Sequence, residues 1–270
     1  MSGLVGPEKS IWFIDELEKL FKEVCVHSSD DALNRVAVQK VGYTLNLSYA
    51  FDSAYQSATE FLEKEVFSKD ILDLRNLDKR LVVLNLFSSN LDKKRLSLEY
   101  IEIAPKVYLS RRKLLEVYGL TVEDVVSIQS LITKIDDTYF NGNSIWEKVK
   151  DEPLIDKLQG DRWLLTGILH QQPHVYSLRI KGNKILSQTN SLKLSSVCAW
   201  LAEQYGRKSI SEMTELFNKV FDTDIPSYKL ADKIKQDGKW DVVITDSMDE
   251  YLDQVASNLD DEDFFVEEFF

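Results

Sequence analysis

The stretch VYSLRIKGNKILSQ, residues 175–188, decides how the second half of this chain folds. Apolar and polar residues alternate from Tyr176 to Ile180, which is typical of a strand with one buried face. Gly182 and Asn183 form a two-residue turn of the kind that matches strand twist, and the apolar pattern then resumes. The stretch therefore predicts a β-hairpin.

Three predicted helices precede this hairpin. Thr121 is followed by acidic residues and then by apolar residues at helical spacing as far as Ile135, which predicts a helix with a threonine N-cap. A short second helix is expected over 144–149. The third begins at Asp161, whose side chain can cap it, and stops before Pro173.

Three helices followed by a hairpin resemble, in element order, the winged-helix (helix-turn-helix) proteins, over residues 121–190. The resemblance implies that the third helix enters the major groove of DNA and that the hairpin reaches a phosphate or the minor groove. The alternative is an ordinary amphipathic helix with a solvated polar face. The expected DNA contacts are Arg162, Thr166, His170, Arg179, Lys181 and Lys184.

Residues 191–255 resemble a second winged-helix unit. Three helices are expected, the first closed by Gly206 and the second capped by Ser209, and WDVVI (240–244) is expected to be a strand. The wing of this unit is short or missing. Lys229 and Lys233 on its third helix are further candidates for nucleic-acid contact.

Residues 1–120 predict a helical N-terminal part. Apolar residues recur at spacings of three and four from Ile11 to Val24, which indicates an amphipathic helix. LVVLNLF (81–87) and LEYIEI (98–103) are rich in β-formers and are expected to pair as a hairpin. The predicted fold class is mainly α with small β-hairpins (α+β): a helical N-terminal part followed by tandem winged-helix units.

The net charge of −12 is unevenly distributed along the 270 residues. Residues 1–120 hold 17 Lys and Arg against 18 Asp and Glu, whereas residues 256–270 hold none against 6. Half of the net charge therefore lies in the last fifteen residues. The rest of the chain is only mildly acidic, so a nucleic-acid surface on it is not excluded.

The sequence closes with DDEDFFVEEFF, residues 260–270. This composition predicts that 256–270 is disordered when alone, because the acids repel and the rings have no core to enter. The stretch resembles the acidic, phenylalanine-terminated tails of single-stranded-DNA-binding proteins, which implies a docking tail that recruits a protein partner. A solubilising tail is the alternative. The expected partner-binding residues are Phe264, Phe265, Phe269 and Phe270.

Enzymatic and metal-binding patterns are weak. No phosphate-binding glycine loop, nucleophile elbow or zinc-protease motif occurs, and no cofactor is expected. His170 and His174 have a spacing that suits zinc, but Pro173 interrupts the helix between them. The acid pairs Asp136-Asp137 and Glu99/Glu102 could hold magnesium in a nuclease. Neither cysteine has a second nearby, and Cys25 and Cys198 are expected to be reduced core thiols.

The favoured interpretation is a non-enzymatic DNA-binding or transcription-associated protein acting on double-stranded DNA, with a tail that docks a protein partner. The alternative is an acidic tandem winged-helix interaction subunit of a larger complex, of the chromosome-organising or the phage and defence type. A metal-dependent nuclease in 1–120 is the third. No signal peptide or membrane span is recognisable, which favours a cytoplasmic protein and is compatible with a nucleoid-associated one. The oligomeric state is left open.

Overall fold

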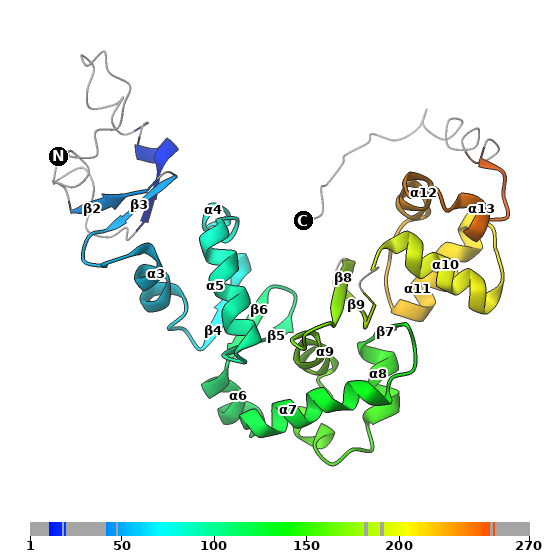
Figure 1. Ribbon diagram of the computed structural model, residues 1–270, viewed down its shortest axis with the longest axis horizontal. Coiled ribbons are helices and arrows are strands. Elements are labelled where there is room, and N and C mark those ends of the chain that lie inside the picture. Colours follow the sequence, from blue (N-terminus) through cyan, green and yellow to red (C-terminus); the bar gives the residue numbers. More distant parts are fainter. Residues whose placement is uncertain are drawn as a thin grey trace. The chain divides into compact units, whose positions relative to one another are not determined.

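The computed structural model divides the chain into two compact units, Met1–Gly119 and Leu120–Phe270 (Figure 1). The predicted coarse class is confirmed, since helices are combined with short antiparallel strands. Lys181, Phe264, Phe265, Phe269 and Phe270 lie outside the described residues. The structure describes residues 11–17, 19, 42–46, 48–180, 183–189, 192–248 and 251.

The first unit opens with a three-stranded antiparallel sheet in the order β1-β3-β2. Its strands are β1 (Ile11–Phe13), β2 (Tyr43–Leu45) and β3 (Tyr49–Asp52). The predicted helix from Ile11 is therefore wrong for its first three residues. These residues are β-formers, and they pair with β3 from Ile11 opposite Phe51 to Phe13 opposite Tyr49.

The first module is residues 58–110, and its strands form an antiparallel sheet in the order β4-β6-β5. A helix, a strand, two helices and a hairpin follow one another along the chain. The elements are α3 (Ala58–Phe61), which continues as the π-helical turn η1 (Leu62–Val66), β4 (Ile71–Asp73), the 3-10 turn η2 (Leu74–Asn76), α4 (Lys79–Val82), α5 (Asn85–Leu96), β5 (Tyr100–Ala104) and β6 (Val107–Ser110). Helix α6 (Arg111–Tyr118) ends the unit.

The strand predicted over 81–87 is wrong, because this segment belongs to α4 and α5. Leu81 and Phe87 are buried on the inner side of these helices. The strand predicted over 98–103 is real, but its hairpin partner is β6, reached through a turn in which Lys106 has φ 63°. Tyr100 holds this strand in the core: its hydroxyl donates to the carbonyl of Phe67 at 2.9 Å, and burial raises its pKa to about 12.

The second module is residues 122–187, and it repeats the same succession of elements. Its sheet has the order β7-β9-β8, so in both modules the last strand lies between the other two. The elements are α7 (Val122–Ser130), the 3-10 turn η3 (Leu131–Lys134), β7 (Tyr139–Asn141), α8 (Gly142–Val149), the 3-10 turn η4 (Ile155–Leu158), α9 (Arg162–His170), β8 (Tyr176–Ile180) and β9 (Asn183–Ser187).

The local predictions for 121–190 hold well. Thr121 caps α7 through a capping box with Asp124, and the Asp161 carboxylate accepts the amide of Leu164 at 2.8 Å. The hairpin of β8 and β9 is confirmed, but the predicted turn position is wrong for Asn183, which begins β9 and pairs with Ile180. Helix α8 begins two residues earlier than expected, with Asn141 as its N-cap, and strand β7 was not predicted.

Residues 192–248 form a helical bundle that packs on the sheet of the second module. Its helices are α10 (Leu194–Tyr205), α11 (Ile210–Phe221), α12 (Ser227–Gln236) and α13 (Trp240–Val243). The strand predicted over 240–244 is wrong: Trp240–Val243 is helical, and only Ile244 forms an isolated bridge, to Lys208. No strand pair follows in the described part of the bundle, in keeping with the expectation that the wing of this unit is short or missing.

The bundle shares its core with the sheet. Ile180 and Ile185 of the hairpin are buried in one cluster with Phe217, Trp240 and Cys198. The prediction that Cys198 is a reduced thiol in the core is therefore confirmed. Burial raises the pKa of this thiol to about 12.

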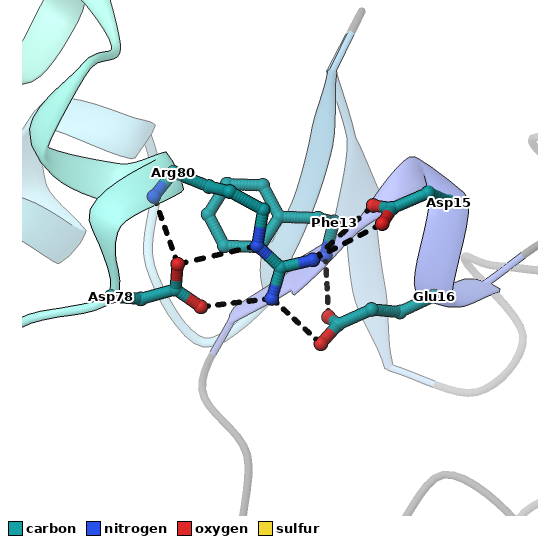
Figure 2. A network of polar contacts seen from close by, with 5 residues as sticks. All are labelled: Phe13, Asp15, Glu16, Asp78 and Arg80. Carbon is teal, nitrogen blue, oxygen red and sulfur yellow. Dashed lines mark hydrogen bonds and ion pairs between the residues drawn. The ribbon is translucent and has the colours of Figure 1, made fainter. Parts of the chain in front are cut away.

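Arg80 joins the N-terminal sheet to the first module (Figure 2). Its Nη2 lies 2.8 Å from carboxylate oxygens of both Glu16 and Asp78, and its Nη1 lies 3.3 Å from Asp15. The guanidinium also covers the ring of Phe13, 4.2 Å from the centroid. These hydrogen bonds, first those with Asp78 and Glu16, raise the pKa of Arg80, so its guanidinium is charged at neutral pH.

Replacing Arg80 by Met should loosen β1 while keeping most of the aliphatic stem on Phe13. The Phe13 amide, which now donates to Glu16 at 3.0 Å, should exchange with deuterium about two- to fivefold faster. Arg75→Met is the matched control, because Arg75 pairs with Asp73, only two residues away. Equal exchange at Phe13 in the two variants would show that Arg80 does not hold the sheet.

Candidate functional site

The structure places the predicted DNA contacts of 121–190 in very different surroundings. Arg162 and Arg179 are exposed, and His170 is half-buried. Thr166 and Lys184 are each only 3% exposed. The expectation that all these side chains point outward together is therefore wrong for Thr166 and Lys184. Arg162, Thr166 and Lys184 do lie around one hollow, with His170 beside Lys184, but Thr166 and Lys184 are inside the unit whereas Arg162 is exposed.

Helix α9 is buried because α8 begins directly against it. A Cβ atom on Gly142, the first residue of α8, would lie 2.8 Å from the Thr166 Oγ1 and 3.2 Å from the Arg162 carbonyl oxygen. Only glycine permits this approach without displacing a neighbour. The Thr166 hydroxyl is satisfied locally, since it donates to the Arg162 carbonyl at 2.7 Å. Consequently six consecutive residues of α9, Leu164–Leu169, are buried.

Lys184 is buried because β9 is the middle strand of its sheet. Alternate side chains point to opposite faces, and both faces are covered: Ile185 enters the core shared with the bundle, while Lys184 faces α9. The Lys184 Nζ lies 5.4 Å from the centroid of the Trp163 ring and 3.5 Å from the His170 Nδ1. The aromatic face and the imidazole replace part of the hydration that burial removes.

The remaining candidates stay apart from this group. Arg179 pairs with Lys184 across the hairpin but is exposed. Lys229 is half-buried near the start of α12, and the exposed Lys233 donates to Gln236 Oε1 at 3.0 Å. Lys229 and Lys233 lie on α12, and Arg179 lies on β8 with its side chain exposed, so none of the three joins the group around Lys184.

A hollow of about 240 Å³ opens above Lys184. It lies between the first residues of α8, the first turn of α9, the start of β9 and the C-terminal end of α11. Its floor is Lys184 with the rings of Trp163 and Phe221, and Arg162 lies at its edge. The hollow thus combines two cations, the carboxylate of Asp222 and two aromatic rings inside one unit, and its cations outnumber its anion by one.

Hydrogen bonds fix the rim of the hollow. Arg162 Nη1 donates to the Asn143 Oδ1, and the Asn143 amide in turn donates to the Asp222 carboxylate at 3.1 Å. The Asn183 amide donates to the Asp222 carbonyl oxygen. Asp222 ends α11 in the left-handed region, with φ 53°, which turns its side chain and its carbonyl toward these partners. The rim is therefore prearranged rather than assembled by a ligand.

The chemistry of the hollow suits binding. A buried ammonium beside aromatic rings favours a ligand that carries both a carboxylate or phosphate and an apolar ring. Sequence reasoning missed this site because its parts come from four separated segments. The one local signal is Gly142 at the first position of a helix, where proline is the favoured residue. Gly142 indicates a close contact between helices only when the position of α9 is already known.

The acid pairs weighed for a nuclease are used otherwise. Glu99 binds Lys94 at 2.8 Å, and this hydrogen bond lowers its pKa. Glu102 is 2% exposed and accepts the amide of Lys106 at 3.1 Å. Asp137 pairs with Lys148 at 2.8 Å. Across the described residues, no group of three His, Cys, Asp or Glu side chains is placed to hold a metal ion.

Comparisons of this chain with protein-family models, with curated proteins and with solved structures found no match. Within the described segments, no helix has the length and apolarity needed to cross a bilayer.

Gly142→Ala should destabilise the second unit by about 1–3 kcal/mol, because the new methyl group meets Thr166 Oγ1 and the backbone of Arg162. Urea unfolding followed by tryptophan fluorescence measures the change.

A double-mutant cycle with Thr166→Ala identifies the contact. Removing Oγ1 relieves the closer of the two clashes, so Gly142→Ala should cost less in the Thr166→Ala background than in the wild type. If the two substitutions are additive, α8 and α9 do not approach one another as described.

Proposed function

We propose that this protein is a non-enzymatic DNA-binding component that contacts duplex DNA through its first module, residues 58–110, and not through residues 121–190. The order of elements supports this proposal, since helix, strand, two helices and hairpin, with the last strand in the middle, is what a winged-helix unit requires. The tandem winged-helix pair would then be 58–110 and 122–187, rather than 121–190 and 191–255.

The exposure of α5 carries the proposal. Helix α5 holds the same place in the first module as α9 in the second, and it would be the helix that enters the major groove. Unlike α9, it has an open polar face whose hydroxyl, amide and ammonium groups suit contacts with phosphates and base edges. The exposed residues of α5 are Asn85, Ser88, Ser89, Asp92, Lys93 and Leu96.

The charge of this region also supports DNA contact. Residues 58–110 hold 9 Lys and Arg against 9 Asp and Glu, and Arg111, Arg112 and Lys113 directly after them raise the net charge of 58–113 to +3 in a chain of −12. Several of these cations are neutralised, including Lys94 by Glu63 and Arg112 by Asp70. Lys93 on α5 and Lys106 at the hairpin turn are exposed, and the described part of the chain contains no ion pair to either. Both are therefore available to phosphates.

A salt series of duplex binding tests this proposal. Fluorescence anisotropy with a short labelled duplex should give a steep negative slope of log affinity against log salt, because phosphate contacts release counterions. Lys93→Glu and Lys106→Glu should each weaken binding and lower the slope by about 1. The matched control is Arg179→Glu, an exposed cation on the hairpin of the second module, which should leave both values unchanged.

Binding that is lost in Arg179→Glu but kept in the other two variants would contradict the proposed contact. Absence of any salt-dependent binding would favour a second candidate function, a protein-interaction subunit built on residues 120–248. The burial of Leu164–Leu169 supports that candidate. A buried α9 contributes to the core of the unit and cannot enter the major groove of DNA. In that case a partner captured by the full chain should be retained when duplex competitor is added.

A further inference from the structure

We infer that the hollow above Lys184 is the docking site for this chain's own residues 260–270, DDEDFFVEEFF, with a phenylalanine ring against Trp163 and Phe221 and a neighbouring carboxylate at Lys184 and Arg162. This inference goes beyond the proposed DNA contact and does not depend on it, because its residues belong to the second unit.

The chemistry of the hollow matches this occupant. Its cations are Lys184, which is 3% exposed, and Arg162, which is exposed at the edge. Both line a site that also includes the half-buried Trp163 and the buried Phe221. A carboxylate gains most from a cation when water is largely excluded, and an aromatic ring gains from leaving water. A ligand with only a carboxylate or only an aromatic ring would make only one of these two kinds of contact.

The C-terminal sequence supplies both groups next to each other. Residues 256–270 hold six carboxylates and no Lys or Arg, and Asp263-Phe264 and Glu268-Phe269 each place an acid beside a ring. The local net charge of −6 opposes the positive charges of the hollow. Charge complementarity therefore selects this segment over the rest of the chain.

The size of the hollow fits a single side chain with its backbone neighbours. Its volume of about 240 Å³ equals roughly eight water molecules at about 30 Å³ each and is smaller than a typical cofactor site. A docked peptide would insert one ring and leave the others outside. Two alternative registers, through Phe264 or Phe269, are available to the segment.

The chain is long enough to reach the hollow. Tyr251, the last described residue, packs on Trp240 of the bundle with the two rings tilted and their centroids 5.2 Å apart. The segment from there to Phe264 can span at most about 45 Å at about 3.3–3.6 Å per residue. A compact unit of this length has a radius of gyration of about 15 Å, so a large part of its surface lies within reach. Attachment to the same unit also gives the segment a high effective concentration, of millimolar order.

The first amides of α8 would report this docking. The N–H groups of Gly142 and Asn143 have no acceptor within the helix, because they belong to its first turn. They line the hollow, where a docked carboxylate would accept from them. Hydrogen exchange at these two amides therefore reads occupancy of the hollow directly.

The experiment compares the full chain with a full-length tail variant in which Phe264, Phe265, Phe269 and Phe270 are replaced by Ser. Exchange at Gly142 and Asn143 should be about twofold or more faster in the tail variant, with no change in the middle of α11. A synthetic peptide of residues 256–270, added to the tail variant, should restore the protection. It should do so less well in the tail variant carrying Arg162→Glu and equally well in the one carrying Arg179→Glu, the matched exposed cation.

Three outcomes would overturn the inference. Equal exchange in the full chain and the tail variant, with no effect of the peptide, would show that the hollow does not take this segment. Equal peptide binding with and without Arg162→Glu would place the segment elsewhere. Protection in the full chain that increases with protein concentration would assign the occupant to a second copy. No DNA is present and Lys93 and Lys106 are unchanged, so failure of this experiment is separate from failure of the DNA proposal.

Discussion

The close approach of α8 to α9 at Gly142 determines what the second unit can present to a partner. With no side chain at this position, Thr166 and the Arg162 carbonyl come within contact distance of the start of α8. Helix α9 is thereby enclosed, and the face of β9 that carries Lys184 is covered. The cationic residues that suggest a DNA-reading surface in the sequence become instead the floor and edge of a hollow. The same approach also brings Asn143 to Arg162 and Asp222, which fixes the rim.

The two modules show how one succession of elements can give different surfaces. Both have an antiparallel sheet whose last strand lies in the middle, and both place two helices before the hairpin. In the first module the longer of these helices, α5, keeps an open polar face, whereas its counterpart α9 is buried along Leu164–Leu169. We therefore propose contact with DNA for the first module and peptide docking for the second unit. Arg80 anchors the N-terminal sheet to the first module.

Local features of the fold could be predicted from the sequence, and features that depend on distant segments could not. Helix capping by Thr121, Asp161 and Ser209 depends only on residues within three positions of each cap. The hairpin of β8 and β9 likewise depends on neighbouring residues, so both could be predicted. Strand β7 has only three residues, too few for an alternating pattern to be recognised. The segment 81–87 is rich in β-formers but is mostly helical. Its buried side chains, Leu81 and Phe87, pack in a core together with residues distant in sequence, such as Phe13 and Tyr108, and these contacts override the local strand propensity. Lys184 is buried because of β7, α9 and the bundle together, and the sequence around it indicates only a polar turn.

Covalent labelling of lysines in the folded full chain, read residue by residue with mass spectrometry, tests the central claim most directly. The inward orientation of the cation on β9 predicts that Lys184 is among the slowest amines to react, while Lys93 and Lys106 are modified rapidly; unfolding in urea should abolish the difference. If Lys184 in the folded chain reacts as fast as Lys93, the residues around it form an outward cationic surface, and α8 and α9 do not enclose a hollow above it.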